Sequence, residues 1–321
     1  MYLKKVLLSE IKNLLGPPRQ NYNIFILNLF GLQIIRYVLF YLKYNIFTKA
    51  DLKTEEGRQL NNNGYLLIKN FFNTQELDQI KVFCKNVENG EKYKIKHYGK
   101  KKVHSYDFCS VENLEVNNND IRSLVLKKLN QSIFIDDIFQ ILKIKKRPLK
   151  NLSYERIVVD NDFNDEGDQD SEFHSDRFYP CIKIFIYLND NKIRNGAFEY
   201  ISKSHKFSLE RLKHEYLYSV FIGGKNVLKK IINMAGYVVK NNRVTFKKEK
   251  IEKIFGNHSI IACEAPANSL VVCNNKGFHK RGRLEGGTER IHLRLNLYDL
   301  QISEFKNNLL LAAKKFKTKK L

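Results

Sequence analysis

Three side chains of the kinds that bind transition metals lie in two segments far apart in the sequence. His174 and Asp176 form a His-x-Asp pair, and His279 follows an apolar run much later in the chain. In an extended segment, residues i and i+2 point to the same side, so the first two can bind one ion together. A lone His-x-Asp pair is also common in surface turns, so it becomes informative only if folding brings His279 beside it. Two imidazoles and one carboxylate on one face of an ion leave three positions open, which is typical of non-haem iron(II) sites.

A fourth residue, Arg290, is a candidate for binding an anionic co-substrate of that metal. It lies eleven residues after His279, and a hairpin through Glu285–Gly287 would bring it back beside the site. 2-Oxoglutarate chelates iron(II) through its keto-acid end and projects a second carboxylate, for which a buried, bidentate Arg is the preferred partner. The pattern predicts iron(II) at the three candidate ligands, 2-oxoglutarate at Arg290, and O2 as the oxidant. The alternative is that Arg290 is an ordinary residue at the exposed end of a strand.

Strands must hold these residues, and the sequence from Leu152 onward supplies them. Short runs rich in β-branched residues alternate with turn signals, a pattern typical of antiparallel sandwiches and barrels. His174 and Asp176 would precede the second of these strands, and His279 would follow the fifth. The expected strands are Leu152–Val159, Ile182–Leu188, Ala197–Ile201, Ile260–Cys263, Ser269–Cys273 and Ile291–Tyr298.

The region before these strands is expected to be mostly helical. Gly64–Phe72 is predicted to be a short apolar strand. Asn73 and Glu76 form a capping-box pattern directly after it, which predicts the start of a helix. One long amphipathic helix is expected over Asp120–Ile144, because apolar residues recur there at helical spacing.

The length of 321 residues suits one large domain with extensions. We expect a helical N-terminal extension over residues 1–60, a catalytic domain over 61–303, and a basic tail over 304–321. Residues 207–257 are expected to form an insert within that domain. The insert would contain a helical stretch at Lys225–Met234 and a hairpin around Asn241-Asn242.

The strong positive charge of the chain has more than one explanation. The formal net charge is +22, and lysine accounts for 42 of the 56 basic residues. Nucleic-acid-binding proteins usually rely on arginine for bidentate contacts, which disfavours DNA or RNA as a partner. The lysine excess is typical of a biased coding sequence. The remaining explanation is attraction to an anionic small molecule or membrane surface.

The five cysteines include no C-x-x-C pair, which argues against a disulfide framework and a cysteine-built zinc site. We expect a cytoplasmic protein, since no secretory signal is evident at the N-terminus. Ile24–Phe47 is the most hydrophobic segment, but Arg36 and Lys43 interrupt it, so it is not predicted to span a membrane. It is expected either to pack on the domain or to lie in a membrane interface, as a peripheral membrane contact.

Several blocks of this chain, in order, carry a family resemblance. They include the apolar strand with its capped helix, FHSDRFYP from Phe173, NGAFEYISKSHK from Asn195, and the segment from Ala265 to Gly282. Together, over roughly residues 64–300, the chain resembles the phytanoyl-CoA dioxygenase family of iron(II)/2-oxoglutarate oxygenases. Arg290 stands where the 2-oxoglutarate-binding Arg of that family is expected.

This resemblance implies an α+β fold with a double-stranded β-helix core, of the jelly-roll or cupin-like kind, and flanking N-terminal helices. It also implies a dioxygenase that hydroxylates its substrate, since related halogenases lack the carboxylate that Asp176 provides. The chain departs from the family at Lys203 and Asn268, where glycine is usual. A further departure is His292, where some related oxygenases place a Ser or Thr that contacts 2-oxoglutarate.

The sequence does not specify the substrate or the oligomeric state. Lysines in Lys92–Phe108 and in the insert favour a small anionic, lipid-linked or glycan-precursor substrate. Two other classes stay open: an oxygenase that modifies a nucleic acid or a protein, and a non-catalytic jelly-roll binding protein. Salt-dependent DNA or RNA binding would favour the first, and a failure to bind iron would favour the second.

Overall fold

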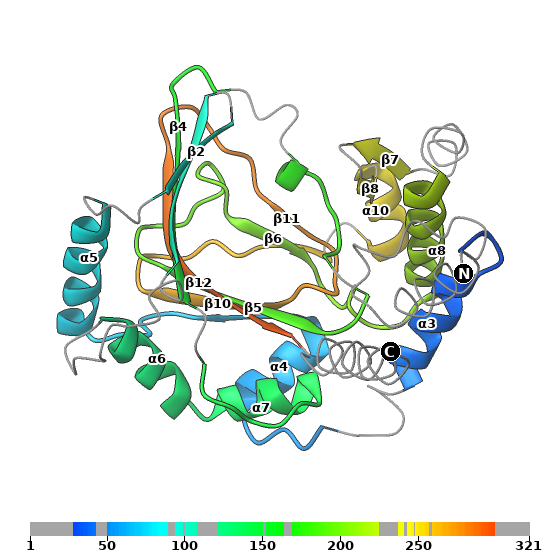
Figure 1. Cartoon of the computed structure of the whole chain (residues 1–321), viewed down its shortest axis with the longest axis horizontal. Helices are drawn as coiled ribbons and strands as arrows, with labels where there is room; N and C mark the ends of the chain where they lie inside the picture. Colours follow the sequence, from blue (N-terminus) through cyan, green and yellow to red (C-terminus); the bar gives the residue numbers. More distant parts are fainter. Residues whose placement is uncertain are drawn as a thin grey trace, which may run out of the picture.

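Two antiparallel sheets form the centre of the molecule, and most helices gather at one side of the larger sheet (Figure 1). This mixture of helices and antiparallel sheets agrees with the predicted α+β class. The computed structural model describes residues 28–42, 50–88, 94–98, 100–107, 121–149, 152–163, 169–176, 178–224, 237–240, 243–246, 248–256 and 259–298.

The larger sheet has seven strands in the order β1-β10-β5-β12-β4-β3-β2, and each neighbouring pair is antiparallel. Four of its strands were predicted from the later part of the sequence, and the hairpin of β2 and β3 at one edge was not. The strands are β1 (Tyr65–Ile68), β2 (Lys94–Tyr98), β3 (Lys101–Asp107), β4 (Leu152–Val159), β5 (Cys181–Tyr187), β10 (Ser269–Asn274) and β12 (Glu289–Tyr298).

The smaller sheet has the order β11-β6-β9, formed by His279–Arg281, Phe198–Ile201 and Ile260–Ala262. A β-bridge joins His174 to His279 at the free side of β11, with backbone N–H to O distances of 2.9 Å in both directions. The smaller sheet therefore brings together the two segments that carry the predicted metal ligands.

The two faces of the larger sheet bury different kinds of side chain, because alternate residues of a strand point to opposite faces. On β5 and β12, the Ile and Leu residues pack into the main hydrophobic core with the helices. The intervening residues face the smaller sheet, where Phe185 and Tyr187 meet Phe198 and Tyr200. Lys183, Arg290 and His292 lie on this same inner face of the larger sheet, as the register of β5 and β12 requires.

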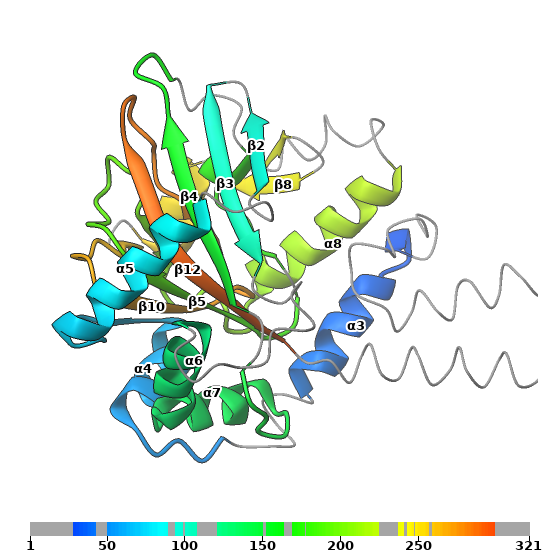
Figure 2. The same cartoon turned by 60° about the vertical axis from the view of Figure 1, so that its left-hand side comes forward.

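Helices α4 (Glu55–Asn63), α5 (Thr74–Glu88), α6 (Ile121–Gln131) and α7 (Phe134–Leu142) pack on the outer face of the larger sheet (Figure 2). The capping box of α5 is confirmed: Glu76 N–H donates to Asn73 Oδ1 at 2.8 Å, and Asn73 N–H donates to Glu76 Oε2 at 2.9 Å. Helix α4 runs across residue 60, and Leu60 is buried in the main core. The boundary expected at residue 60 therefore falls inside an element of the core.

The prediction of one helix over Asp120–Ile144 is wrong, because α6 and α7 are separate helices. Ser132 ends α6: its hydroxyl donates to the backbone oxygen of Lys128 at 2.9 Å. Such back-bonding by serine competes with the helical pattern. The apolar spacing continues through this break, so it could not reveal the change of direction.

The predicted insert contains α8 (Leu209–Gly224), the hairpin of β7 (Tyr237–Lys240) with β8 (Arg243–Phe246), and α10 (Lys248–Phe255). The hairpin agrees with the prediction around Asn241-Asn242, and α8 and α10 were not predicted. The helical stretch expected at Lys225–Met234 lies outside the described residues. A cluster of apolar side chains joins the insert to Phe173 and Phe278, which flank the predicted ligands in the sequence.

Helix α3 (Leu32–Tyr41), within the hydrophobic segment Ile24–Phe47, packs beside α8 (Figure 1). Its buried positions include Gln33, Arg36 and Tyr37, whereas Ile35 and Leu39 are exposed. α3 thus packs on the domain through a largely polar face. In the described part of the chain, no helix is both long enough and apolar enough to cross a membrane.

Candidate metal centre

The structure brings His174, Asp176 and His279 together, with one potential ligand atom of each lying within 4.8 Å of the others. Asp176 Oδ1 lies 3.6 Å from His174 Nε2, and Asp176 Oδ2 lies 3.8 Å from His279 Nε2. The β-bridge between the two histidines sets their spacing, and the hydrogen bond from Asp176 N–H to Asn275 O at 3.1 Å fixes the third ligand. The His-x-Asp pair is therefore largely buried against the β11 segment and does not lie in a surface turn.

Both imidazoles are oriented to offer the same nitrogen to an ion. His174 Nδ1 lies 2.7 Å from the backbone oxygen of Glu172, and His279 Nδ1 lies 3.0 Å from that of Gly277. These contacts favour the tautomer with hydrogen on Nδ1, which directs the Nε2 lone pair toward the centre. Asn275 Nδ2 lies 3.1 Å from His279 Nε2, so an ion would replace this contact. Burial lowers the pKa of His279 to about 3, so this ring is neutral at pH 7, the form that binds metals.

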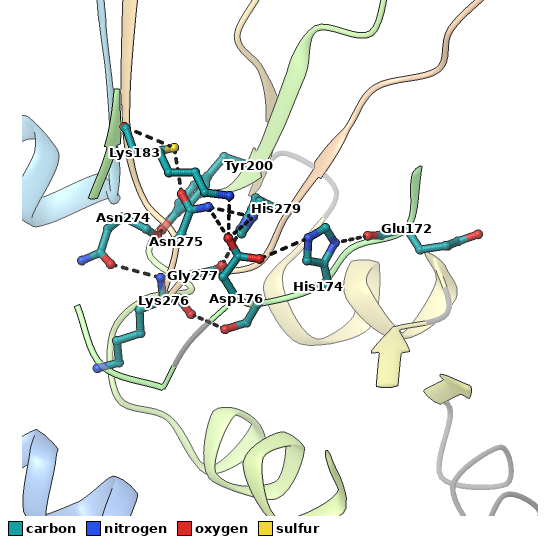
Figure 3. Close-up of polar contacts among 12 residues, drawn as sticks. Glu172, His174, Asp176, Lys183, Tyr200, Asn274, Asn275, Lys276, Gly277 and His279 are labelled. Atoms are coloured by element: carbon teal, nitrogen blue, oxygen red, sulfur yellow. Dashed lines mark hydrogen bonds and ion pairs between the residues drawn. The ribbon is translucent and has the colours of Figure 1, made fainter. Parts of the chain in front are cut away.

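Asp176 is held as a carboxylate by two donors that the sequence did not reveal as site residues. Lys183 Nζ lies 2.6 Å from Asp176 Oδ2, and Asn275 Nδ2 donates to the same oxygen at 2.8 Å. Figure 3 shows both side chains converging on this carboxylate from the side of His279. Burial alone would raise the pKa of Asp176, but the ammonium of Lys183 and the two imidazoles hold it well below its usual value.

The turn between β10 and β11 organises much of this centre. Asn275 Oδ1 accepts a hydrogen bond from Cys273 Sγ at 3.0 Å, and Tyr200 Oη donates to Asn274 O at 2.9 Å. Gly277 lies against Tyr200, since a Cβ at this glycine would be 1.9 Å from the tyrosine oxygen. A larger residue at this position would therefore displace the carbonyl that orients His279.

Arg290 is buried on the inner face of the larger sheet and is not the exposed strand-end residue of the alternative prediction. Its Nη1 donates to the backbone oxygen of Gly196, and its Nε–H is buried with no partner among the described residues. Burial lowers its pKa, and the guanidinium of Arg281 adds to this effect. A buried guanidinium without a carboxylate partner fits the second carboxylate of 2-oxoglutarate.

His292, the departure expected to alter the co-substrate pocket, belongs to a separate buried ion-pair network. Glu155 Oε2 lies 3.3 Å from His292 Nε2, and Glu155 Oε1 lies 2.7 Å from Arg294 Nη1. Burial would raise the pKa of Glu155, but its contacts with His292 and Arg294 lower it to about 2. Glu155 is thereby paired with these two residues, and Arg290 forms no ion pair with a carboxylate among the residues that the structure describes.

The other two departures from the family pattern are explained by the backbone. Lys203 and Asn268 have φ angles of 64° and 68°, in the left-handed region where glycine is favoured. Asn268 also uses its side chain, accepting from Phe72 N–H at 2.8 Å and donating to Phe72 O at 2.6 Å. His205 hydrogen-bonds to Asn61 O at 3.0 Å and so has a structural role.

Three solved structures show limited similarity to the chain. The non-heme alpha ketoglutarate dependent carbocyclase SnoK from nogalamycin biosynthesis is 14% identical, with 77% of this chain and 83% of that chain covered and a TM-score of 0.44. The epimerase SnoN, in complex with Fe3+, alpha ketoglutarate and nogalamycin RO, is 9% identical, with 76% and 82% covered and a TM-score of 0.47. HygX from Streptomyces hygroscopicus, with nickel, 2-oxoglutarate and hygromycin B bound, is 13% identical, with 76% and 86% covered and a TM-score of 0.41. Similarity at this level does not define a shared substrate or reaction.

The sequence itself identifies the family. A comparison with curated proteins gave no match. The profile of the phytanoyl-CoA dioxygenase family matches residues 60–258. This match contains His174 and Asp176 and ends before His279, which the structure places against them. The chain belongs to the phytanoyl-CoA dioxygenase family.

Proposed function

We propose that this protein is an iron(II)- and 2-oxoglutarate-dependent dioxygenase that hydroxylates its substrate. The observation that carries the proposal is the convergence of His174, Asp176 and His279, with one potential ligand atom of each within 4.8 Å of the others. Arg290 supports it as a buried cation that has no ion pair with a carboxylate in the described part of the chain. Membership of the phytanoyl-CoA dioxygenase family agrees with both features.

The chain's own residues position and shield the reacting groups. His174, Asp176 and His279 would hold iron(II), and Arg290 would hold 2-oxoglutarate. When bound, iron(II), 2-oxoglutarate and O2 supply the oxidation of an unreactive carbon–hydrogen bond, coupled to the conversion of 2-oxoglutarate to succinate and carbon dioxide. Phe198 stacks against the ring of His279, with centroids 5.4 Å apart, and keeps water from that side of the centre.

Anaerobic titration with iron(II) and 2-oxoglutarate tests the proposal directly. The weak visible charge-transfer band of the chelate should appear with the natural protein and be absent with Asp176→Ala. In air, the natural protein should form succinate, and the variant should not. Full succinate production by Asp176→Ala would overturn the assignment of this residue as a metal ligand.

We also propose that the two sheets form a double-stranded β-helix. The strand order supports this, because β4, β12, β5 and β10 lie side by side in one sheet while β11, β6 and β9 form the other. The bridge at His174 adds a further extended segment to the smaller sheet. The metal ligands would then lie inside this β-helix, at the smaller sheet.

For the substrate, we propose a small anionic molecule, of which lipid-linked compounds and glycan precursors are examples. The net charge of +22 supports an anion. A nucleic-acid substrate would instead give binding that weakens steeply with salt. We expect the affinity for DNA or RNA to be undetectable at 150 mM salt; tight, salt-dependent binding would favour the nucleic-acid alternative.

We further propose peripheral membrane contact through residues 24–47. Within the described part of this segment, Leu29, Phe30, Ile35 and Leu39 are exposed, which supports contact with an apolar phase. Flotation with anionic liposomes should recover the whole chain, and recover less of a chain that begins at residue 50. The shorter chain begins at residue 50 so that α4 stays complete, because Leu60 of α4 belongs to the main core. Equal flotation of the two chains would contradict this proposal.

A further inference from the structure

Lys183 is the one basic residue in the apolar strand β5, whose sequence is CIKIFIY. Its side chain is only 24% exposed and lies on the inner face of the larger sheet. Lysine is seldom buried to this extent unless a partner or a ligand compensates its charge. The position of Lys183 beside a metal ligand therefore requires a functional or structural explanation.

The ammonium of Lys183 has donors left over after its ion pair is made. Its Nζ lies 2.6 Å from Asp176 Oδ2, and no other partner of this group lies among the described residues. An ammonium carries three N–H donors. Asn275 already donates to the same carboxylate oxygen at 2.8 Å, so the orientation of Asp176 does not depend on Lys183 alone.

The charge balance of the centre also favours an additional anion. With a divalent ion bound, the centre would hold that ion and the Lys183 cation against a single carboxylate, since imidazoles bind metals in their neutral form. Burying this excess of positive charge is unfavourable unless a further anion enters. If Lys183 served only to neutralise Asp176, its positive charge would repel the metal ion, and no other interaction of Lys183 would offset this cost.

The register of the larger sheet places Lys183 and Arg290 at two ends of one face. Lys183 pairs with Asn296 of β12, and Arg290 lies six residues before Asn296, roughly 20 Å along an extended strand. Two long side chains that extend toward each other can hold a five-carbon dicarboxylate between them. Lys183 would contact its end at the metal, and Arg290 its far end.

We propose that Lys183 binds the carboxylate of 2-oxoglutarate that lies at the metal, next to the keto group. This inference rests on the proposed function and adds to it a second anion-binding residue. Lys183 is then a co-substrate-binding residue in addition to a partner of Asp176.

Calorimetric titration of the Mn(II)-saturated protein tests this assignment, because Mn(II) allows binding to be measured separately from turnover. The two ligands are 2-oxoglutarate and pyruvate, which keeps the keto-acid end and lacks the far carboxylate. Lys183→Met should weaken both ligands by roughly ten- to hundredfold, the loss expected for one charge-assisted hydrogen bond. Arg290→Met should weaken 2-oxoglutarate by a similar factor and leave pyruvate unchanged.

Lys280→Met is the matched control. Lys280 has the same side-chain exposure of 24% and an ion pair to Glu199 at 3.3 Å. It alternates with His279 and Arg281 on β11, so its side chain points to the opposite face. This variant should bind Mn(II) and both ligands as the natural protein does. Lys183→Gln, which keeps two N–H donors without the charge, provides a second variant if Lys183→Met does not fold.

These titrations distinguish failure of the proposed function from failure of the role proposed for Lys183. If the natural protein binds Mn(II) and does not bind 2-oxoglutarate, the proposed function fails. If the natural protein and Lys183→Met bind 2-oxoglutarate and pyruvate equally well, only the role of Lys183 is overturned. A variant with weaker Mn(II) binding and unchanged ligand binding would show that Lys183 does no more than hold Asp176.

Discussion

Replacing Arg290 with methionine should leave the ligand-free protein at least as stable and should reduce its stabilisation by 2-oxoglutarate. In the ligand-free protein, Arg290 is buried, and within the described residues its Nε–H has no partner and its one hydrogen bond goes to the backbone oxygen of Gly196. Methionine has a similar length and no charge. We therefore expect the free energy of unfolding of Arg290→Met to equal that of the natural protein or to exceed it by about 1–3 kcal/mol. Replacing buried ionic groups with apolar ones often has this effect.

With 2-oxoglutarate at a hundred times its dissociation constant, the natural protein should gain about 2.7 kcal/mol of stability. A hundredfold loss of affinity would leave the variant at its own dissociation constant, where the gain is about 0.4 kcal/mol. The ligand should therefore stabilise the natural protein by about 2 kcal/mol more than the variant. This difference can reverse the order of stability of the two proteins.

Urea unfolding of the Mn(II)-loaded proteins, with and without 2-oxoglutarate, measures both effects. Mn(II) is held constant, because metal binding also contributes to stability. Equal stabilisation of the two proteins by 2-oxoglutarate would refute the role of Arg290. A ligand-free variant that is less stable by several kcal/mol would show that the guanidinium is satisfied within the protein.

Four further changes test the structure around the site. Asp137→Ala should lower the free energy of unfolding by about 2–4 kcal/mol in urea unfolding, because Asp137 accepts the backbone N–H groups of Lys53 and Thr54, both at 2.9 Å. Gly277→Ala should cost about 3 kcal/mol through its clash with Tyr200 and weaken Mn(II) binding in calorimetry. Lys203→Gly should raise the melting temperature, with a gain of about 1 kcal/mol from relief of its positive φ. Burial and Arg211 lower the pKa of His214 to about 3, so stability should fall as the pH falls from 6.5 toward 3, where only the unfolded chain takes up a proton. His214→Gln should reduce the slope of unfolding free energy against pH in that range by about 1.4 kcal/mol per unit.

Local chemistry in the sequence was sufficient to predict several parts of this protein. The capping box at Asn73 acts within one helical turn, so its residues specify it without help from the rest of the chain. β4 occupies the predicted residues Leu152–Val159. The residue types and spacing of His174 and Asp176 indicated a shared ligand position, because period-two geometry is a property of any extended segment.

The parts that depend on distant contacts required the folded chain. The break between α6 and α7 leaves the apolar spacing unchanged. β3 joins the hairpin of β2 and β3 to the sheet by pairing with β4, which lies much later in the sequence. In the sequence, Lys183 was notable only as a charged residue within an apolar strand. Its contact with Asp176 depends on how β5 lies beside the candidate metal ligands in the folded chain. Whether Arg290 is exposed or buried was open in the sequence, since burial depends on which sheet faces it, and the packing of the two sheets places it inside.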